Sequence, residues 1–204
     1  MSAQPVVAVT ASEFTAPCVA FARTRLLAAG YAVTVFDADG PAFERFVRAG
    51  HAAGVLDLVT GDLAGSAGAS DRLTAASLVG VPQVVSLGGF DAVAVNPLGT
   101  LRRTTPEECD RLGQEVAMKA CAARGPTAVV IPRRGISSLD FDGGPHWSPE
   151  ANAALFQSLR NWVYGVELVE LDLHVNDAEF GEACADALLR LLRVTNLSQS
   201  TTGR

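Results

Sequence analysis

Basic residues are scarce in this sequence. Of its 204 residues, 16 are Lys or Arg and 22 are Asp or Glu, so the net charge is −6 at pH 7. This balance excludes a broad basic surface of the kind that binds nucleic acid. Lysine occurs only once, at Lys119, which excludes any mechanism that needs two lysines.

Long hydrophobic runs are also missing, although 49% of the residues are hydrophobic. The first apolar run, Val6–Thr10, is too short for a signal peptide or a membrane span. The four cysteines form no CxxC pair, which is typical of free thiols in a reducing compartment. We therefore expect a cytoplasmic protein that contacts neither a membrane nor a nucleic acid.

Several motifs that would assign a chemistry are absent. There is no GxxxxGK[ST], so a P-loop NTPase is excluded, and there is no GxGxxG after the first apolar run. Neither HExxH nor a Cys/His cluster with zinc spacing occurs, so we expect no metal site. Residues 64–68 (Ala-Gly-Ser-Ala-Gly) loosely resemble a hydrolase nucleophile elbow but lack its first glycine. A flexible Gly/Ser loop is the favoured interpretation.

Short valine-rich runs alternate with longer segments of helical spacing. The predicted strands are Val6–Thr10, Ala32–Phe36, Gly54–Val59, Gln83–Ser86, Ala128–Pro132 and Val166–Asp172. The predicted helices are Pro17–Ala29, Pro41–Ala49, Asp71–Leu78, Pro106–Ala123, Pro149–Val163 and Asp177–Arg193. The alternation predicts an α/β fold: a Rossmann-like three-layer sandwich with a mostly parallel six-stranded sheet in the order 3-2-1-4-5-6. Residues 1–194 form this single domain, and we expect a disordered tail over residues 195–204.

Polar residues gather after the predicted strands. In an open α/β sheet, ligands bind beyond the carboxyl ends of the strands, where a helix N-terminus also offers amides to an anion. We expect the ligand-binding residues to converge there, with glycines allowing close approach and an arginine anchoring charge. These residues are Ser12, Thr15, Gly88, Arg134, Gly135 and Ser137.

Four residues near the same edge are candidates for catalysis. His174 is the candidate general acid/base, and the alternative is a residue bonded to a loop carbonyl. Glu13 is a candidate carboxylate base. Cys18, in the first turn of a helix, is a candidate nucleophile or a small buried filler. Asp140, like Asp91, could orient a base or hold a substrate hydroxyl, and the alternative is a solvated turn aspartate.

Blocks of residues resemble the second half of the Tm-1-like ATP-binding domain family. The matching blocks include Thr10–Cys18, Gly80–Ser86, Arg103–Glu108, Ile131–Asp140 and Asp172–Phe180. The resemblance covers about Val6 to Leu192. Within these blocks, Arg103 and Arg134 match the family as possible anion holders, with surface salt bridges as the alternative.

The resemblance also has departures. The family's first half is absent, and Asp37–Pro41 replaces the glycine-rich stretch that usually follows the second strand. ATP is implied only by the resemblance, because the added acids would repel a triphosphate. No other cofactor is indicated.

Two functions are compatible with these features. One is a cytoplasmic small-molecule enzyme of hydrolase or lyase type whose ligand carries a carboxylate or phosphate. The other is a non-catalytic nucleotide-binding, ligand-binding or scaffold subunit that pairs with itself or with a separately encoded first half. Either would suit a homo-oligomer, most simply a two-fold dimer.

Overall fold

The six predicted strands form one parallel sheet. The computed structural model describes residues 4–38, 41–61, 63, 72–96 and 100–202. The strands of the sheet are β1 (Val6–Ala11), β2 (Ala32–Asp37), β3 (Gly54–Val59), β4 (Gln83–Gly88), β7 (Thr127–Pro132) and β8 (Glu167–Leu171). All neighbouring pairs in this sheet are parallel, as expected for strands linked by helical crossovers. The α/β three-layer class is therefore confirmed.

The order of the strands corrects the predicted 3-2-1-4-5-6. The sheet runs β2-β1-β3-β4-β7-β8, so β1 pairs with β2 on one side and with β3 on the other. Right-handed crossovers permit either order, so handedness alone could not select one. Burial distinguishes the two orders. Every residue of β3 is buried, as expected for a central strand, whereas β2 is partly exposed at the edge, with Val35 43% exposed. The sheet therefore reverses direction between β1 and β3, as in flavodoxin-like folds, and not between the first and fourth strands.

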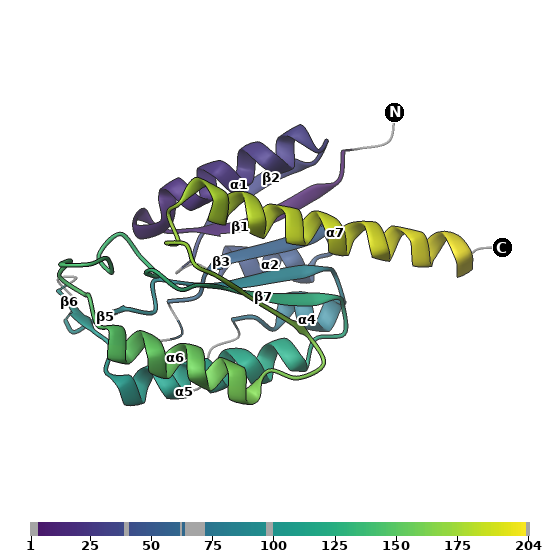
Figure 1. Ribbon diagram of the computed structural model, residues 1–204. Coiled ribbons are helices and arrows are strands. Elements are labelled where there is room, and N and C mark those ends of the chain that lie inside the picture. Colours follow the sequence, from purple (N-terminus) through teal and green to yellow (C-terminus); the bar gives the residue numbers. More distant parts are fainter. Residues whose placement is uncertain (1–3, 39–40, 62, 64–71, 97–99, 203–204) are drawn as a thin grey trace.

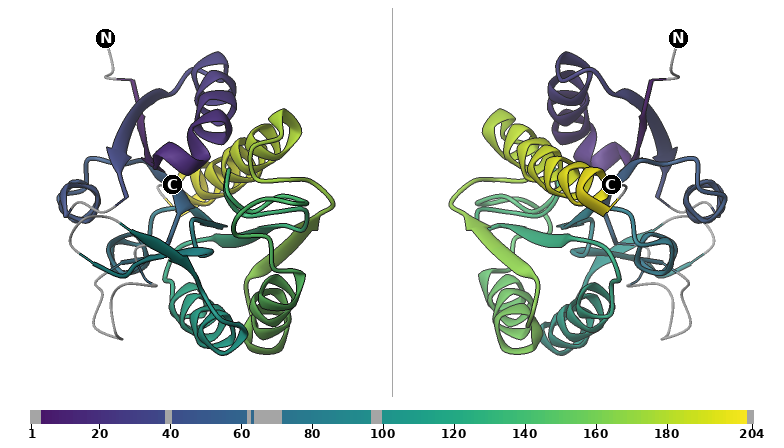
Figure 2. Two further views of the ribbon diagram at one scale, coloured as in Figure 1. Left: turned by 90° about the vertical axis from the view of Figure 1, so that its left-hand side faces the viewer. Right: turned by 90° about the vertical axis from the view of Figure 1, so that its right-hand side faces the viewer.

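Helices cover both faces of the sheet (Figures 1 and 2). On one face, α1 (Ala16–Ala28) packs against α7 (Ala178–Thr202), and their apolar side chains share a core with β1, β3 and β7. On the other face lie α5 (Pro106–Cys121) and α6 (Pro149–Trp162), which form a second core, and the short helices α2 (Ala42–Arg48) and α4 (Ala75–Val79). Gly80 ends α4 in a left-handed conformation.

Two features depart from the sequence prediction. An antiparallel pair, β5 (Ala92–Ala94) and β6 (Leu101–Arg103), lies between β4 and α5 outside the main sheet. The helix α7 continues to Thr202, into the tail that was predicted to be disordered, and projects beyond the sheet (Figure 1). Within the described residues, no helix is both long and apolar enough to span a membrane.

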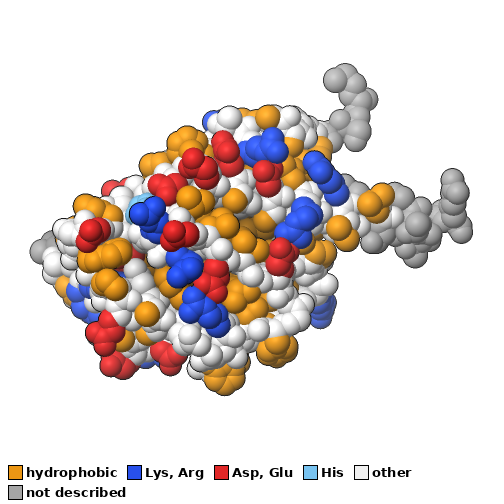
Figure 3. Space-filling model, viewed as in Figure 1, with side chains coloured by type: hydrophobic (Ala, Val, Ile, Leu, Met, Phe, Trp, Pro, Cys, Tyr) orange, Lys and Arg blue, Asp and Glu red, His pale blue; other side chains and the backbone are white. Residues whose placement is uncertain are grey.

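Opposite charges are interspersed on the face shown in Figure 3. The surface ion pairs of the protein include Arg25 with Asp186, Arg160 with Glu170 and Arg190 with Glu167. Such exposed pairs contribute little stability individually. The four cysteines are free thiols, which confirms the prediction. Residues 64–68, the possible nucleophile elbow, lie outside the described residues.

Candidate functional site

The loops at the carboxyl edge of the sheet are bonded to one another. The carbonyl of Phe14, in the short 3-10 helix η1 (Glu13–Thr15) after β1, accepts from Ser138 N at 3.0 Å and from Asn176 Nδ2 at 3.0 Å. Gly89 N, after β4, donates to Ile136 O at 3.1 Å. Loops that follow β1, β4, β7 and β8 therefore form one connected set, as the carboxyl-edge rule predicts. Asn176, which directly precedes the predicted helix Asp177–Arg193, belongs to this set.

His174 links two of these loops through its ring. Its Nε2 lies 3.0 Å from Ser137 O and 3.2 Å from Asp140 O, and its Nδ1 lies 3.1 Å from Asn176 N. Since a backbone N–H can only donate, Nδ1 accepts, and the neutral ring carries its proton on Nε2. Both nitrogens are thus bonded to the backbone. This favours the alternative that His174 holds loop carbonyls, and its catalytic role stays a prediction.

The two predicted site glycines lie where the chain packs closely. A Cβ at Gly88 would lie 2.4 Å from Leu58 O and 2.9 Å from Thr15 Cγ2. Gly135 has φ +137°, and a Cβ there would lie 2.5 Å from His174 Cδ2. Protein atoms, rather than an open space, surround both positions. Glycine is therefore required by the packing of the loops themselves.

The remaining predicted residues of the first loop have different surroundings. Ser12 Oγ lies 3.2 Å from Thr15 Oγ1, and Glu13 between them is exposed. Cys18, in the first turn of α1, is completely buried, and burial raises the pKa of its thiol to about 12. A thiol with this pKa is protonated at neutral pH, which favours the small-filler interpretation over a nucleophile. Arg134 is exposed and has no ion-pair partner among the described residues.

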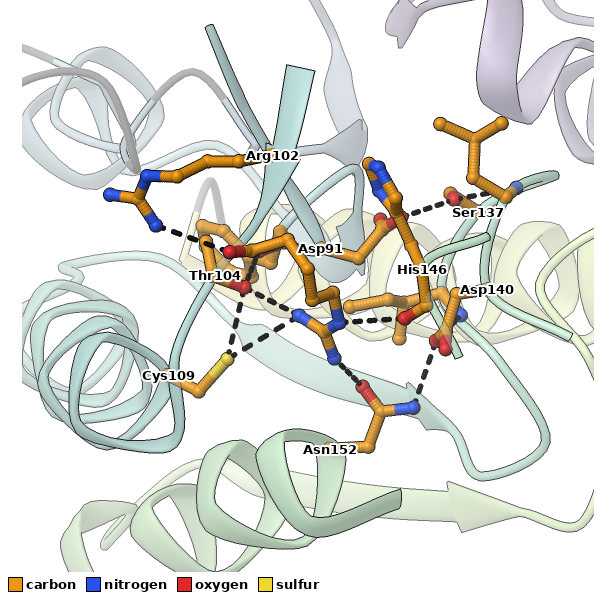
Figure 4. A network of polar contacts seen from close by, with 12 residues as sticks. Asp91, Arg102, Thr104, Cys109, Ser137, Asp140, His146 and Asn152 are labelled. Atoms are coloured by element: carbon orange, nitrogen blue, oxygen red, sulfur yellow. Dashed lines mark hydrogen bonds and ion pairs between the residues drawn. The ribbon is translucent and has the colours of Figure 1, made fainter. Parts of the chain in front are cut away.

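A second group of polar residues centres on Asp91 and His146 (Figure 4). Asp91 follows β4 and is completely buried, and its Oδ2 lies 3.2 Å from His146 Nδ1. The same oxygen accepts from Ser137 Oγ at 2.7 Å. A carboxylate can only accept, so His146 donates from Nδ1 and presents Nε2 as the acceptor. No hydrogen bond engages Nε2 within the part of the chain that the structure describes.

Arg103 connects this pair to the loop after β7. Its Nε donates to His146 O at 2.8 Å, and its Nη2 donates to Asn152 Oδ1 at 2.6 Å. Asn152 Nδ2 donates in turn to Asp140 Oδ2 at 2.8 Å, and Ile136 N donates to the same oxygen at 3.0 Å. Burial raises the pKa of Asp140, although these two hydrogen bonds oppose the change. Asp140 is completely buried, which excludes a solvated turn aspartate.

His146 was missed by the sequence reasoning, which found no Cys/His cluster with zinc spacing and named His174 alone among the histidines as a candidate. A usable signal existed: His146 lies shortly before the Ser148-Pro149 start of a predicted helix. In a parallel α/β fold, helices begin at the edge where strands end, so this segment belongs to the same site edge. Asp91, in contrast, was already considered as a residue that could orient a base.

Comparisons with known proteins place the chain in a family. The model of the uncharacterised protein family (UPF0261) C-terminal domain matches residues 4–102 and 93–192. The chain belongs to the UPF0261 family. A UPF0261 protein of Rhizobium meliloti is 33% identical over 91% of this chain and 54% of its own length. The ToMV resistance protein Tm-1(GCR237) of Solanum lycopersicum is 33% identical over 91% of this chain and 28% of its own length. The resemblance to Tm-1-like proteins is thereby confirmed.

The UPF0261 chain described here spans about half the length of the bacterial relatives it matches, 54% in the Rhizobium protein. Among solved structures, a diflavin flavoprotein A3 from Nostoc sp. matches 97% of this chain and 99% of its own at 10% identity, with a TM-score of 0.40. A similarity this low carries no information about function.

Proposed function

We propose that this UPF0261 domain is a small-molecule enzyme in which Asp91 and His146 form an acid–base pair. The observation that supports it is the bond from His146 Nδ1 to the buried carboxylate of Asp91, which leaves Nε2 without a partner among the described residues. A carboxylate that fixes the tautomer and orientation of an imidazole is a recurring arrangement in general-base catalysis. The pair lies beyond the carboxyl end of β4, at the edge where α/β proteins bind ligands.

The pair favours proton transfer over covalent catalysis. Ser137, the nearest hydroxyl, donates to Asp91 and accepts from Leu139 N at 3.0 Å. Its oxygen is bonded to Asp91 and not to the histidine, so it is not arranged as an activated nucleophile. His146 Nε2 would instead take a proton from the substrate or from a water, in a reaction of lyase or hydrolase type. Arg134, exposed on the neighbouring loop, is the candidate to bind a carboxylate or phosphate on the substrate.

ATP does not fit the residues after the first two strands. Glu13 follows β1, Asp37 ends β2, and both carboxylates are exposed at the same edge of the sheet. Ser12 and Thr15 bond to each other. Two neighbouring negative charges would repel a triphosphate. We therefore assign no step to ATP, and the nucleotide remains an implication of the family resemblance.

The test combines ligand identification with paired variants. Small molecules that copurify with the protein are identified by native mass spectrometry, and a panel of carboxylates and phosphates is screened for turnover. We expect His146→Gln and Asp91→Asn to lower turnover about 10²–10⁴-fold while ligand binding persists. His51→Gln, at an exposed histidine outside the site, is the matched control. Unchanged turnover in His146→Gln would contradict the proposed function.

A ligand-binding subunit is the alternative. It is favoured by the length of the matched relatives, since 54% of the Rhizobium protein aligns with this chain and the remainder could complete a site. In that case the purified domain binds its ligand, turnover is absent from the whole panel, and a partner chain or a second copy restores it. A cytoplasmic location is part of both proposals.

A further inference from the structure

The hairpin that the sequence did not predict brings two adjacent residues beside the acid–base pair. In the antiparallel pairing of β5 with β6, Ala92 lies opposite Arg103. Asp91 directly precedes Ala92, and Thr104 directly follows Arg103. The register therefore places the main chain of Thr104 next to that of Asp91.

Thr104 forms hydrogen bonds with the two backbone carbonyls that flank the Cα of Asp91. Thr104 N donates to Asp91 O at 3.3 Å, and its Oγ1 donates to Phe90 O at 2.7 Å. The residue is buried, so water does not compete for these bonds. The main chain from which the Asp91 carboxylate projects is thus held at two successive carbonyls.

Arg103 holds the other member of the pair. Its Nε donates to His146 O, and its Nη2 reaches Asn152 on α6, as described above. Its Nη1 donates to Thr104 Oγ1 and lies 3.7 Å from Cys109 Sγ. Of the five N–H donors of a guanidinium, four are directed at protein atoms. Little capacity remains for a substrate anion.

We propose that Arg103 and Thr104 are positioning residues that together set the geometry of the Asp91–His146 pair, Thr104 through the main chain of Asp91 and Arg103 through that of His146. This inference rests on the proposed function for its consequence, and on the hydrogen bonds alone for its geometry. It assigns Arg103 a role other than the expected anion binding.

The bond from Arg103 matters because, among the described residues, few other hydrogen bonds fix the position of His146. Its N donates to Leu139 O at 3.0 Å, its Nδ1 bonds to Asp91, and its carbonyl accepts from Arg103. Without the bond from Arg103, the loop before α6 can shift. The His146 ring would shift with it and would no longer direct Nδ1 at the Asp91 carboxylate. A small displacement of a catalytic group has large effects on rate, so positioning has functional consequences.

The tautomer of His146 reports this geometry without a substrate. In protein labelled with ¹⁵N-histidine, we expect neutral His146 to carry its proton on Nδ1 and neutral His174 to carry it on Nε2. The His146→Gln variant assigns the signals by their loss. His174, whose contacts do not involve Arg103 or Thr104, serves as an internal control in every spectrum.

Matched variants separate positioning from mere stability. Thr104→Val removes the hydroxyl donor at nearly constant shape and Thr104→Ser retains it, while Arg103→Lys keeps the charge but offers a single donor group. We expect Thr104→Val and Arg103→Lys to convert the Nδ1–H signal of His146 into a mixture of tautomers, with His174 unchanged, and Thr104→Ser to preserve it. Each spectrum is recorded well below the unfolding temperature of the variant.

Two outcomes would overturn the inference. The first is a lowered unfolding temperature in Thr104→Val and Arg103→Lys with the His146 tautomer intact, which would show a purely structural role. The second is a change at His174 as large as that at His146, which would show general loosening of the loops. If Thr104→Val does not fold, Arg103→Lys alone decides between these outcomes. Because the spectra require no turnover, the positioning role can hold even if His146→Gln retains full activity and the proposed function fails.

Discussion

Replacement of Glu108 tests whether the block that starts α5 contributes to stability through its charge. Glu108 Oε2 accepts from Thr105 N at 2.9 Å, and Thr105 Oγ1 accepts from Glu108 N at 3.2 Å, which is a complete capping box. Arg102 donates to both carboxylate oxygens, at 2.7 and 2.6 Å. These contacts, led by the Arg102 hydrogen bonds, lower the pKa of Glu108 to about 2.

The contribution of the Glu108 carboxylate to the free energy of unfolding follows from this pKa. A fall of the pKa from the ordinary value of 4.5 to about 2 corresponds to at most ~3 kcal/mol of stability at neutral pH. The Glu108 side chain is 24% exposed and its partner is more exposed, so solvent screening reduces the expected contribution to about 1–2 kcal/mol. Loss of a helix cap alone costs a similar amount.

The sign of the pH dependence is fixed by the lowered pKa. Because the folded state holds the proton less tightly than the unfolded state, the contribution is complete above pH 4.5 and is lost as the pH falls toward 2. We expect Glu108→Gln to unfold about 1–2 kcal/mol more easily than the parent at pH 7, with a smaller difference near pH 3. Contributions from Asp140 and Glu44, whose pKa values burial raises, have the opposite sign but are common to both proteins and cancel.

Urea unfolding followed by tryptophan fluorescence measures the difference, with Arg102→Gln as the partner variant in a double-mutant cycle. Glutamine at position 108 can still accept from Thr105 N, so the cycle isolates the charged part of the interaction. A Glu108→Gln protein as stable as the parent at pH 7 would refute the reasoning. A difference that does not shrink in acid would refute it as well, since it would show that the ion pair with Arg102 contributes nothing.

Local signals explain why the elements could be predicted from the sequence. Valine-rich runs and segments of helical spacing each involve residues close together in the chain, and the corresponding strands and helices are present in the structure. The order of the strands depends instead on which strand gains most from burial at the centre. That choice between Gly54–Val59 and Ala32–Phe36 needs the burial of the whole assembled sheet, which no single segment contains.

The candidate site was predictable in outline for a similar reason. The carboxyl-edge rule depends only on strand direction, and the structure places Thr15 beside Gly88 and His174 beside Ser137 at this edge. That these residues bind a ligand stays a prediction. The partners of individual side chains depend on register and rotamer. His146 pairs with a carboxylate 55 positions away in the chain, a separation at which one sequence carries no pairing signal.

Three further predictions concern thiols, assembly and backbone strain. Ellman's reagent should label Cys121, the one of the four fully described cysteines that is not buried, while Cys18 reacts only on unfolding; rapid labelling of Cys18 would contradict its burial. Light scattering at roughly tens of micromolar protein should show a homo-oligomer, most simply a dimer, and a monomer would count against self-association. Gly135→Ala should cost at least about 2 kcal/mol, because a side chain at φ +137° is strained and its Cβ would clash first with the backbone oxygen of Asp140 and then with His174 Cδ2, at 2.5 Å. Gly143→Ala is the matched control, since its φ is also positive, at +79°, but no atom lies within 4 Å of the added Cβ. It should therefore cost only the left-handed penalty of about 1 kcal/mol. Equal losses in the two glycine variants, measured by urea unfolding, would show that crowding by Asp140 O and His174 contributes nothing beyond backbone strain.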